Sequence, residues 1–210
     1  MRLICLLLSL ALAGCLTTGK RGNEALPAIY DLGVMPAKNG LVNPSTVTAV
    51  EVRPPHWLDT KGIDYRLLYN EPARLREYSL ARWAGPPSQL IQQRLVQQLD
   101  MHSAGQASAR CLLRVELSEF AHWFDSPERS RGVLRAKVLL LDKAWVTLAE
   151  REISIDKSAA SPDSQGGVSA LLATVEQLSS DLLVWKKSPE ILEATLKSCV
   201  PPLRLAGYSR

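Results

Sequence analysis

The sequence predicts an α+β fold, in which a mainly antiparallel sheet carries two principal helices on one face and a short helix follows near the C-terminus. Alternating apolar and polar residues mark several segments of this 210-residue chain as strands with one buried face. Two longer segments repeat their apolar residues with the period of a helix. Strands precede each of these segments, and this order favours helices gathered on one face of a sheet.

Four strands are expected in the first part of the chain, because β-branched and aromatic residues cluster there between prolines and other turn-forming residues. They are residues 27–34 (PAIYDLGV), 45–52 (STVTAVEV), 63–69 (IDYRLLY) and 73–83 (ARLREYSLARW). The period then changes after Gly85-Pro86-Pro87-Ser88. Ile91, Leu95 and Leu99 stand four residues apart and predict an amphipathic helix whose glutamines face solvent.

Three further strands follow, each alternating apolar with charged residues. They are residues 110–120 (RCLLRVELSEF), 133–141 (VLRAKVLLL) and 151–157 (REISIDK), with turns expected at Asp125 to Gly132 and at Asp142-Lys143. Residues 158–167 (SAASPDSQGG) read as a polar loop. Apolar residues from Val168 to Trp185 then recur at intervals of three and four and predict a helix packed on the sheet. Ser188 and Pro189 begin a short last helix.

The N-terminus reads MRLICLLLSLALAGC, a short positive start followed by an apolar run that is too brief to span a bilayer. Such a run is typical of a secretion signal. Leu12-Ala13-Gly14-Cys15 resembles the bacterial lipobox, in which the cysteine is acylated and becomes the first residue of the mature chain. The alternative is an incidental cysteine beside an ordinary cleavage site. Leu16 follows the cysteine, where an aspartate would signal retention at the inner membrane, so the sorting rule favours the outer membrane.

This interpretation predicts three regions. Residues 1–14 form a lipoprotein signal peptide, residues 15–26 hold the lipidated cysteine and a flexible tether, and residues 27–210 form a single periplasmic domain. The formal net charge of +4 comes from mixed acidic and basic residues, and this small value does not favour nucleic acid as a partner.

Two cysteines, Cys111 and Cys199, remain to be explained in the mature chain. In an oxidising periplasm they can pair, and a bond would staple the last short helix to the sheet. On that helix Leu192, Leu196 and Cys199 share one face by spacing. The alternative is two buried free thiols, each acting as a small apolar residue.

The sequence holds little that suggests catalysis. His56, His102 and His122 have no partner at metal-ligand spacing, and neither a nucleophile elbow nor a Walker A motif occurs. His122 is expected at the surface or half-buried at a strand end. We therefore expect no enzyme activity, no metal, and no cofactor apart from the lipid on Cys15.

One stretch, residues 50–99, resembles the ABC-type transport auxiliary lipoprotein family. The matching pieces are Trp57-Leu58-Asp59, Tyr65-Arg66-Leu67, Tyr69, Pro72, Tyr78, Arg82-Trp83-Ala84, Pro86, Leu90, Arg94 and Leu95. Gly85 departs from the alanine or acidic residue usual at its position. The lipobox and the order of strands and helices extend the likeness over most of the mature chain.

The resemblance implies an outer-membrane-attached accessory of a mammalian-cell-entry-type lipid transporter, of which the paraquat-inducible system is an example. Its partners would be the periplasmic entry-type protein and, through it, the ABC complex; a homo-oligomer is left open. Two alternatives are a pilot or assembly lipoprotein of another envelope machine and a lipid-anchored enzyme. Trp83 and Tyr65 are candidates either for a partner-facing surface or for the core, and a tryptophan between a strand and a helix more often fills the core.

Overall fold

The computed structural model describes residues 25–34, 48–105 and 109–200, so Cys15 and most of the expected tether lie outside the described residues. Within these ranges the fold is α+β, with a mainly antiparallel sheet and helices packed on it, and the predicted class is confirmed. The helices are η2 (His56–Leu58, a 3-10 turn), α2 (Pro87–Leu99), α3 (Ser164–Lys186) and α4 (Pro189–Ser198). The strands are β1 (Ala28–Tyr30), β2 (Thr48–Arg53), β3 (Gly62–Leu67), β4 (Glu71–Trp83), β5 (His102–Ser103), β6 (Cys111–Ser126), β7 (Arg129–Leu141) and β8 (Thr147–Ser158).

The long strand β6 organises the sheet. On one side it pairs antiparallel with β7, which pairs antiparallel with β8. On its other side, the first half of β6 pairs with β2 and the second half pairs with β3, both in parallel, so β2 and β3 lie end to end. β4 pairs antiparallel with β3, and β1 and β5 add parallel edges. Alternation along β6, β7 and β8 predicted their buried faces but could not reveal these parallel pairs.

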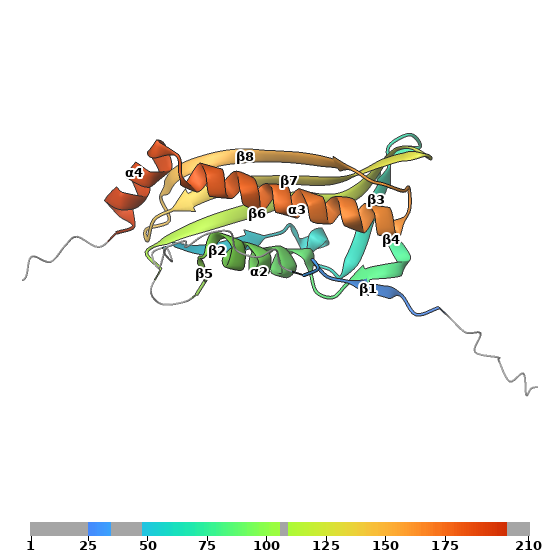
Figure 1. Ribbon diagram of the computed structural model, residues 1–210, viewed down its shortest axis with the longest axis horizontal. Coiled ribbons are helices and arrows are strands. Elements are labelled where there is room, and N and C mark those ends of the chain that lie inside the picture. Colours follow the sequence, from blue (N-terminus) through green and yellow to red (C-terminus); the bar gives the residue numbers. More distant parts are fainter. Residues whose placement is uncertain (1–24, 35–47, 106–108, 201–210) are drawn as a thin grey trace, which may run out of the picture.

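Helices α2 and α3 lie in front of the sheet in Figure 1, with α2 against β2 and α3 against β7 and β8. Their apolar stripes and the inward strand residues make one core, which includes Val50, Leu95, Val115 and Leu171. The outward strand residues are charged and paired instead. These ion pairs are Arg114–Glu51, Arg66–Glu119, Arg131–Asp125, Arg135–Asp156 and Lys137–Glu150. The uncovered sheet face is therefore polar.

Two glycines bring α3 close to the strands. A Cβ on Gly132 would stand 2.6 Å from the backbone of Ala170 and Leu171, and one on Gly167 would stand 2.3 Å from Nδ1 of His122. The sequence predicted a loop through residue 167, but α3 begins at Ser164 and is capped by Asp163, whose carboxylate accepts from the amide of Gly166 at 2.8 Å. The glycine pair permits close packing here and does not break the helix.

The turn expected from Asp125 to Gly132 is much shorter than predicted, because β6 continues to Ser126 and β7 starts at Arg129. These longer strands separate β1, where the chain enters the domain, from the last helix, α4. β1 runs parallel to β4, away from the β6–β7 turn, whereas α4 lies at the start of β6 (Figure 1). β6 has 16 residues, so its start, near α4, and the β6–β7 turn are about 50 Å apart.

None of the helices in the described ranges is long and apolar enough to cross a membrane.

Candidate functional site

The last helix, α4, is held to the sheet by a disulfide. Cys111 at the start of β6 and Cys199 just after α4 are bonded, with their Cα atoms 5.4 Å apart, within the reach of such a bond. Both cysteines are buried with Leu140 and Ile191 in a small apolar cluster separate from the main core. The predicted helix face is wrong in part, because Ile191 and not Leu192 is buried.

The reason is the direction from which α4 approaches the sheet. Leu192 is 49% exposed and Leu196 is 67% exposed, although both share the face of Cys199 by spacing alone. Ile191 in α4 and Cys199 just after it are the only fully buried residues of this segment. The helix therefore contacts the rest of the domain through a narrow surface. Much of the apolar surface of α4 is left open to solvent.

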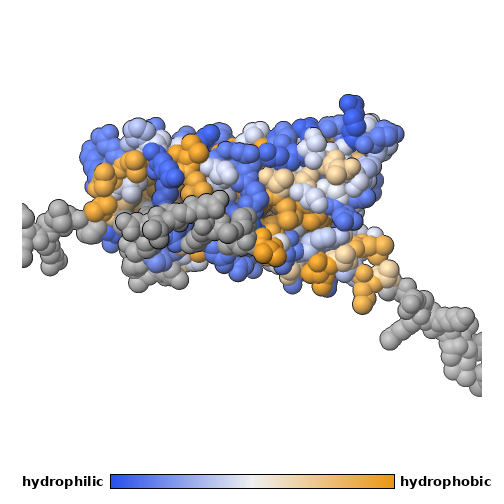
Figure 2. Space-filling view, viewed as in Figure 1, coloured by the Kyte–Doolittle hydropathy of each residue, from blue (hydrophilic) through white to orange (hydrophobic). Residues whose placement is uncertain are grey.

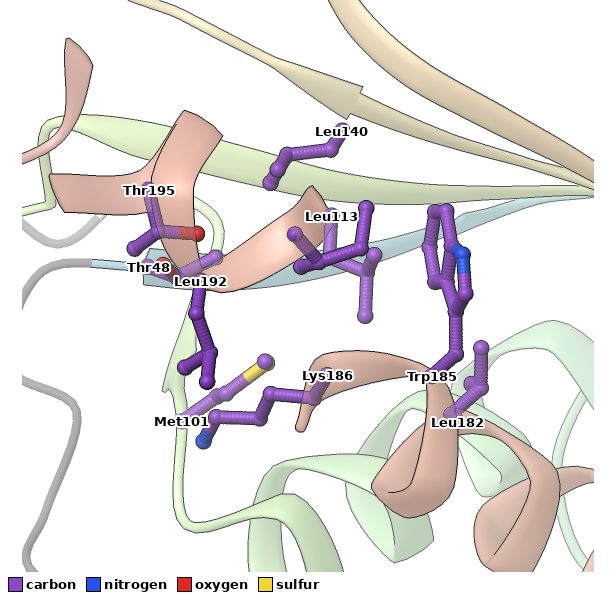
Figure 3. Close-up of a pocket in the computed structure, with 10 residues that line it drawn as sticks. Thr48, Met101, Leu113, Leu140, Leu182, Trp185, Lys186, Leu192 and Thr195 are labelled. Atoms are coloured by element: carbon purple, nitrogen blue, oxygen red, sulfur yellow. The ribbon is translucent and has the colours of Figure 1, made fainter. Parts of the chain in front are cut away.

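A cavity of about 120 Å³ lies beneath α4 (Figure 3). It is bounded by α3, α4, three strands and the segment after α2. The lining side chains are Thr48, Met101, Leu113, Leu140, Leu182, Trp185, Lys186, Ile191, Leu192 and Thr195. All but Lys186 and the two threonine hydroxyls are apolar, so the cavity suits a hydrocarbon group and offers few groups for orienting a polar substrate.

Exposed apolar residues surround this end of the molecule. Val184 of α3 is 72% exposed, and Trp145 and Val146 in the β7–β8 turn are 62% and 56% exposed. That turn lies beside the start of β6, because Leu141 pairs with Leu112. Figure 2 shows orange surface where α4 lies, where β1 lies and in further patches between them. We call the end that carries α4, its cavity and the β7–β8 turn the α4 end.

The stretch that carries the family resemblance proves largely structural. Leu58 and Leu95 are buried in the core, and the hydroxyl of Ser88 donates to Asp59 at 3.3 Å, which ties η2 to the start of α2. Arg94 is 3% exposed, so its buried guanidinium needs several hydrogen-bond acceptors. Each of these residues has a structural role in the fold.

Arg94 fastens the N-terminal segment to the two large helices. Its guanidinium donates to the backbone carbonyls of Leu32 and Gly33 and to Glu176 on α3, the last at 2.7 Å. Five donors on a planar group can serve several acceptors at once, as Arg94 does here. The segment that leads from the predicted anchor is thus fixed to the domain at a defined place.

Of the two aromatic candidates, Trp83 lies in the core and Tyr65 is half-buried. Trp83 is 1% exposed, with its ring 5.8 Å from that of Phe120. Tyr65 is half-buried, with its ring 4.6 Å from that of Tyr78. The Trp83 ring is therefore not exposed for contact with a partner.

His122 is fully buried in the middle of β6, so the expectation of a surface or half-buried position at a strand end is wrong. Its ring lies under Gly167, and Nδ1 is 2.9 Å from the hydroxyl of Tyr78. Among the described residues nothing hydrogen-bonds to Nε2. Burial lowers the pKa of His122 to about 4, and the charge of Asp163 opposes this only partly. His122 is therefore neutral at pH 7.

This burial predicts a loss of stability in acid. The unfolded chain takes up the proton near pH 6.5, whereas the fold resists protonation until about pH 4. Stability from neutral His122 is thus complete above pH 6.5 and is lost as the pH falls toward 4. Relative to His122→Phe, the wild type should lose about 2–3 kcal/mol of unfolding free energy between pH 7 and pH 4.5. Denaturant unfolding at both pH values measures this difference.

The comparison with the variant is needed because Asp64 acts in the opposite direction. Burial, together with the charges of Glu77 and Glu119, raises the pKa of Asp64 to about 6. The protonated carboxyl is favoured in the fold, so acid restores stability at this site. That contribution is the same in the wild type and in His122→Phe and cancels from the difference. Parallel pH profiles for the two proteins would contradict the burial argument.

The described residues contain no group of three or more histidine, cysteine or acidic side chains arranged to hold a metal ion. The features that stand out are the α4 end and the clamp on the N-terminal segment. Together they describe an α+β domain whose N-terminal segment is held by Arg94 and whose α4 end exposes apolar residues.

Comparisons with known proteins agree with this description. A family model described as "ABC-type transport auxiliary lipoprotein component" matches residues 30–182, and the chain belongs to this family. It is similar in fold to the crystal structure of protein XCC0632 from Xanthomonas campestris, with 17% identity and a TM-score of 0.65 over 81% of this chain and 98% of that one. An uncharacterized protein of known structure is also similar, with 18% identity and a TM-score of 0.59 over 76% of this chain and 98% of that one. No curated protein matches significantly.

Proposed function

We propose that the protein is a non-catalytic lipoprotein, anchored in the outer membrane, that docks the periplasmic part of an ABC-type intermembrane transporter for lipids or other hydrophobic molecules. The partner in contact with it is an entry-type periplasmic protein. Membership of the auxiliary family supports a role in transport. The lipobox at Cys15 and the absence of aspartate at position 16 support the outer-membrane address.

The observation that carries the proposal is the opposite placement of the two ends. The chain enters the domain at β1, at the right of Figure 1, and α4 lies at the left, at the start of β6. A lipid on Cys15 would hold the β1 end toward the membrane. The α4 end, with its exposed leucines, would then face the periplasm, where a transporter can reach it.

Site-specific photocrosslinking in cells tests the docking surface. A benzoylphenylalanine at Leu196, on the exposed side of α4, should capture an entry-type protein identified by mass spectrometry. The matched control is position 152, where Glu152 is exposed on β8 on the polar sheet face. Capture from position 152 but not from 196 would contradict the α4 end as the docking surface. Capture of only a secretin or a lipopolysaccharide-export component would favour the pilot alternative.

Membrane fractionation tests the anchor separately. The wild type should sediment with the outer membrane and begin at an acylated Cys15, whereas Cys15→Ala should remain an uncut precursor or become soluble. Leu16→Asp should move the lipoprotein to the inner membrane without changing the domain. An unmodified mature chain that starts at another residue would overturn the lipoprotein interpretation.

A further inference from the structure

We infer that the cavity beneath α4 is a ligand site. It binds one acyl chain of an anionic single-chain amphiphile, a fatty acid, with the hydrocarbon among the leucines and the carboxylate at Lys186. The site extends the proposed docking role but does not depend on it, because a chain can bind a ligand here whether or not a transporter docks.

The lining carries the first part of the argument. Leucines from α3, α4, β6 and β7 meet Met101 and Trp185 around the cavity, as Figure 3 shows for the labelled side chains. Such a surface offers dispersion contacts in every direction and almost no hydrogen bonds, which matches an unbranched hydrocarbon. Apolar cavities of this size stay dry and take up apolar ligands.

The size limits the ligand. About 120 Å³ has room for about four groups of methylene size, taking ~30 Å³ for each, the volume of a water molecule in the liquid. One chain end can therefore enter, but two chains side by side cannot. The rest of a longer chain would lie over the exposed side of Leu192 at the mouth, which is 49% exposed.

Lys186 supplies the charge complementarity. It is half-buried at the rim, and its ammonium donates to the carbonyl of Leu99 at 3.1 Å. An ammonium can make three hydrogen bonds, so a carboxylate can bind beside this carbonyl. Asp100 adds a negative charge nearby that partly offsets the cation. The site should therefore prefer a carboxylate over an alcohol by a modest factor.

The disulfide keeps the wall of the site in place. Ile191, Leu192 and Thr195 of α4 form one side of the cavity, and α4 is attached mainly through Ile191 and the bond from Cys199 to Cys111. If the bond is absent, α4 loses its covalent attachment and the cavity loses that wall. Binding should then depend on the oxidised state.

Calorimetry on the mature chain without its lipid, residues 16–210, tests the site, because this form retains every described residue. Alkanoates from propanoate to dodecanoate are used below their micellar concentrations. Affinity should rise about fourfold per methylene until about four chain carbons fill the cavity, and less steeply for the longer acids, whose further methylenes lie over Leu192. 10-Bromodecanoate should quench the fluorescence of Trp185, and Trp185→Phe should remove that quenching. Absence of saturable decanoate binding would overturn the proposal.

Matched variants separate the parts of the site. Thr195→Trp fills the cavity from α4 and should weaken decanoate binding at least tenfold, whereas Leu196→Trp, on the exposed side of the same helix, should not. Lys186→Met should weaken decanoate binding about five- to tenfold but leave decanol binding unchanged, and Lys187→Met is its control. Equal loss for the acid and the alcohol would refute the charge contact.

The outcomes are independent of those for docking. If alkanoates fail to bind while position 196 still captures an entry-type protein, the acyl-chain site is wrong and the docking role stands. If binding persists without capture, the reverse holds. Reduction, or the double change Cys111→Ser with Cys199→Ser, should abolish the preference for longer chains, with circular dichroism confirming that the sheet and α3 remain folded.

Discussion

Replacing both Cys111 and Cys199 by serine should lower the unfolding free energy by about 4–5 kcal/mol. The bond joins residues 88 positions apart, and a closed loop of this length removes that much chain entropy from the unfolded state. A typical domain has only about 5–15 kcal/mol of net stability, so the oxidised form should tolerate far more denaturant than the reduced form. Guanidinium titration of the two proteins measures the difference.

The effect of losing the bond can be separated from the effect of poorer packing around the two cysteines. Cys111→Ala with Cys199→Ala preserves the apolar surroundings of Leu140 and Ile191, so it should lose nearly the same free energy as the serine pair. Hydrogen exchange should then be fastest in α4, because Ile191 is its only other fully buried residue. Unchanged stability in both pairs would show that the loop contributes little to the entropy of the unfolded chain.

The sequence predicted the parts of the fold that depend on local pattern. Alternation along β6, β7 and β8 gave their buried faces, and the apolar spacing from Val168 to Trp185 gave most of α3. A bond between Cys111 and Cys199 was one of two interpretations of the sequence, beside two free thiols, and the structure shows the bond. The fold class followed from the order of these elements.

What the sequence could not give depends on how distant elements approach one another. The position of His122 was misjudged because its neighbour Trp123 suggests a strand end, whereas β6 runs on to Ser126. The start of α3 was missed because glycines usually mark loops, yet Gly167 is needed where the helix lies on the His122 ring. Asp163, three residues before Gly166, was the available N-cap signal.

The cavity beneath α4 had no signal in the sequence at all. Its lining comes from α3, α4 and three strands, and a void forms where such side chains fail to fill the space between elements. The buried side of α4 was also misassigned, because a helical period states which residues share a face and not which face meets the sheet. Ile191 and Leu192 differ by one position, and only the approach of α4 decides between them.

Trp83→Ala should lower the unfolding free energy by about 3–5 kcal/mol, the cost of removing a large buried aromatic side chain and leaving a cavity. The ring is 1% exposed and lies 5.8 Å from that of Phe120, in the main core at the end of β4. Trp57→Ala is the matched control, because Trp57 belongs to the same family-like stretch but is 61% exposed. Its replacement should change stability by less than about 0.5 kcal/mol.

The pair of variants decides what each tryptophan does. If Trp83 contributes to the core, its loss should shift the denaturation midpoint strongly, and capture of a partner from position 196 should decline only in proportion to the folded fraction. Trp83→Phe should recover much of the stability, because an aromatic ring still fills most of the space. If Trp83 were a docking residue, Trp83→Ala would instead leave the midpoint unchanged and abolish capture by the folded protein. The burial of its ring predicts the first outcome, and circular dichroism with crosslinking on the same samples distinguishes the two.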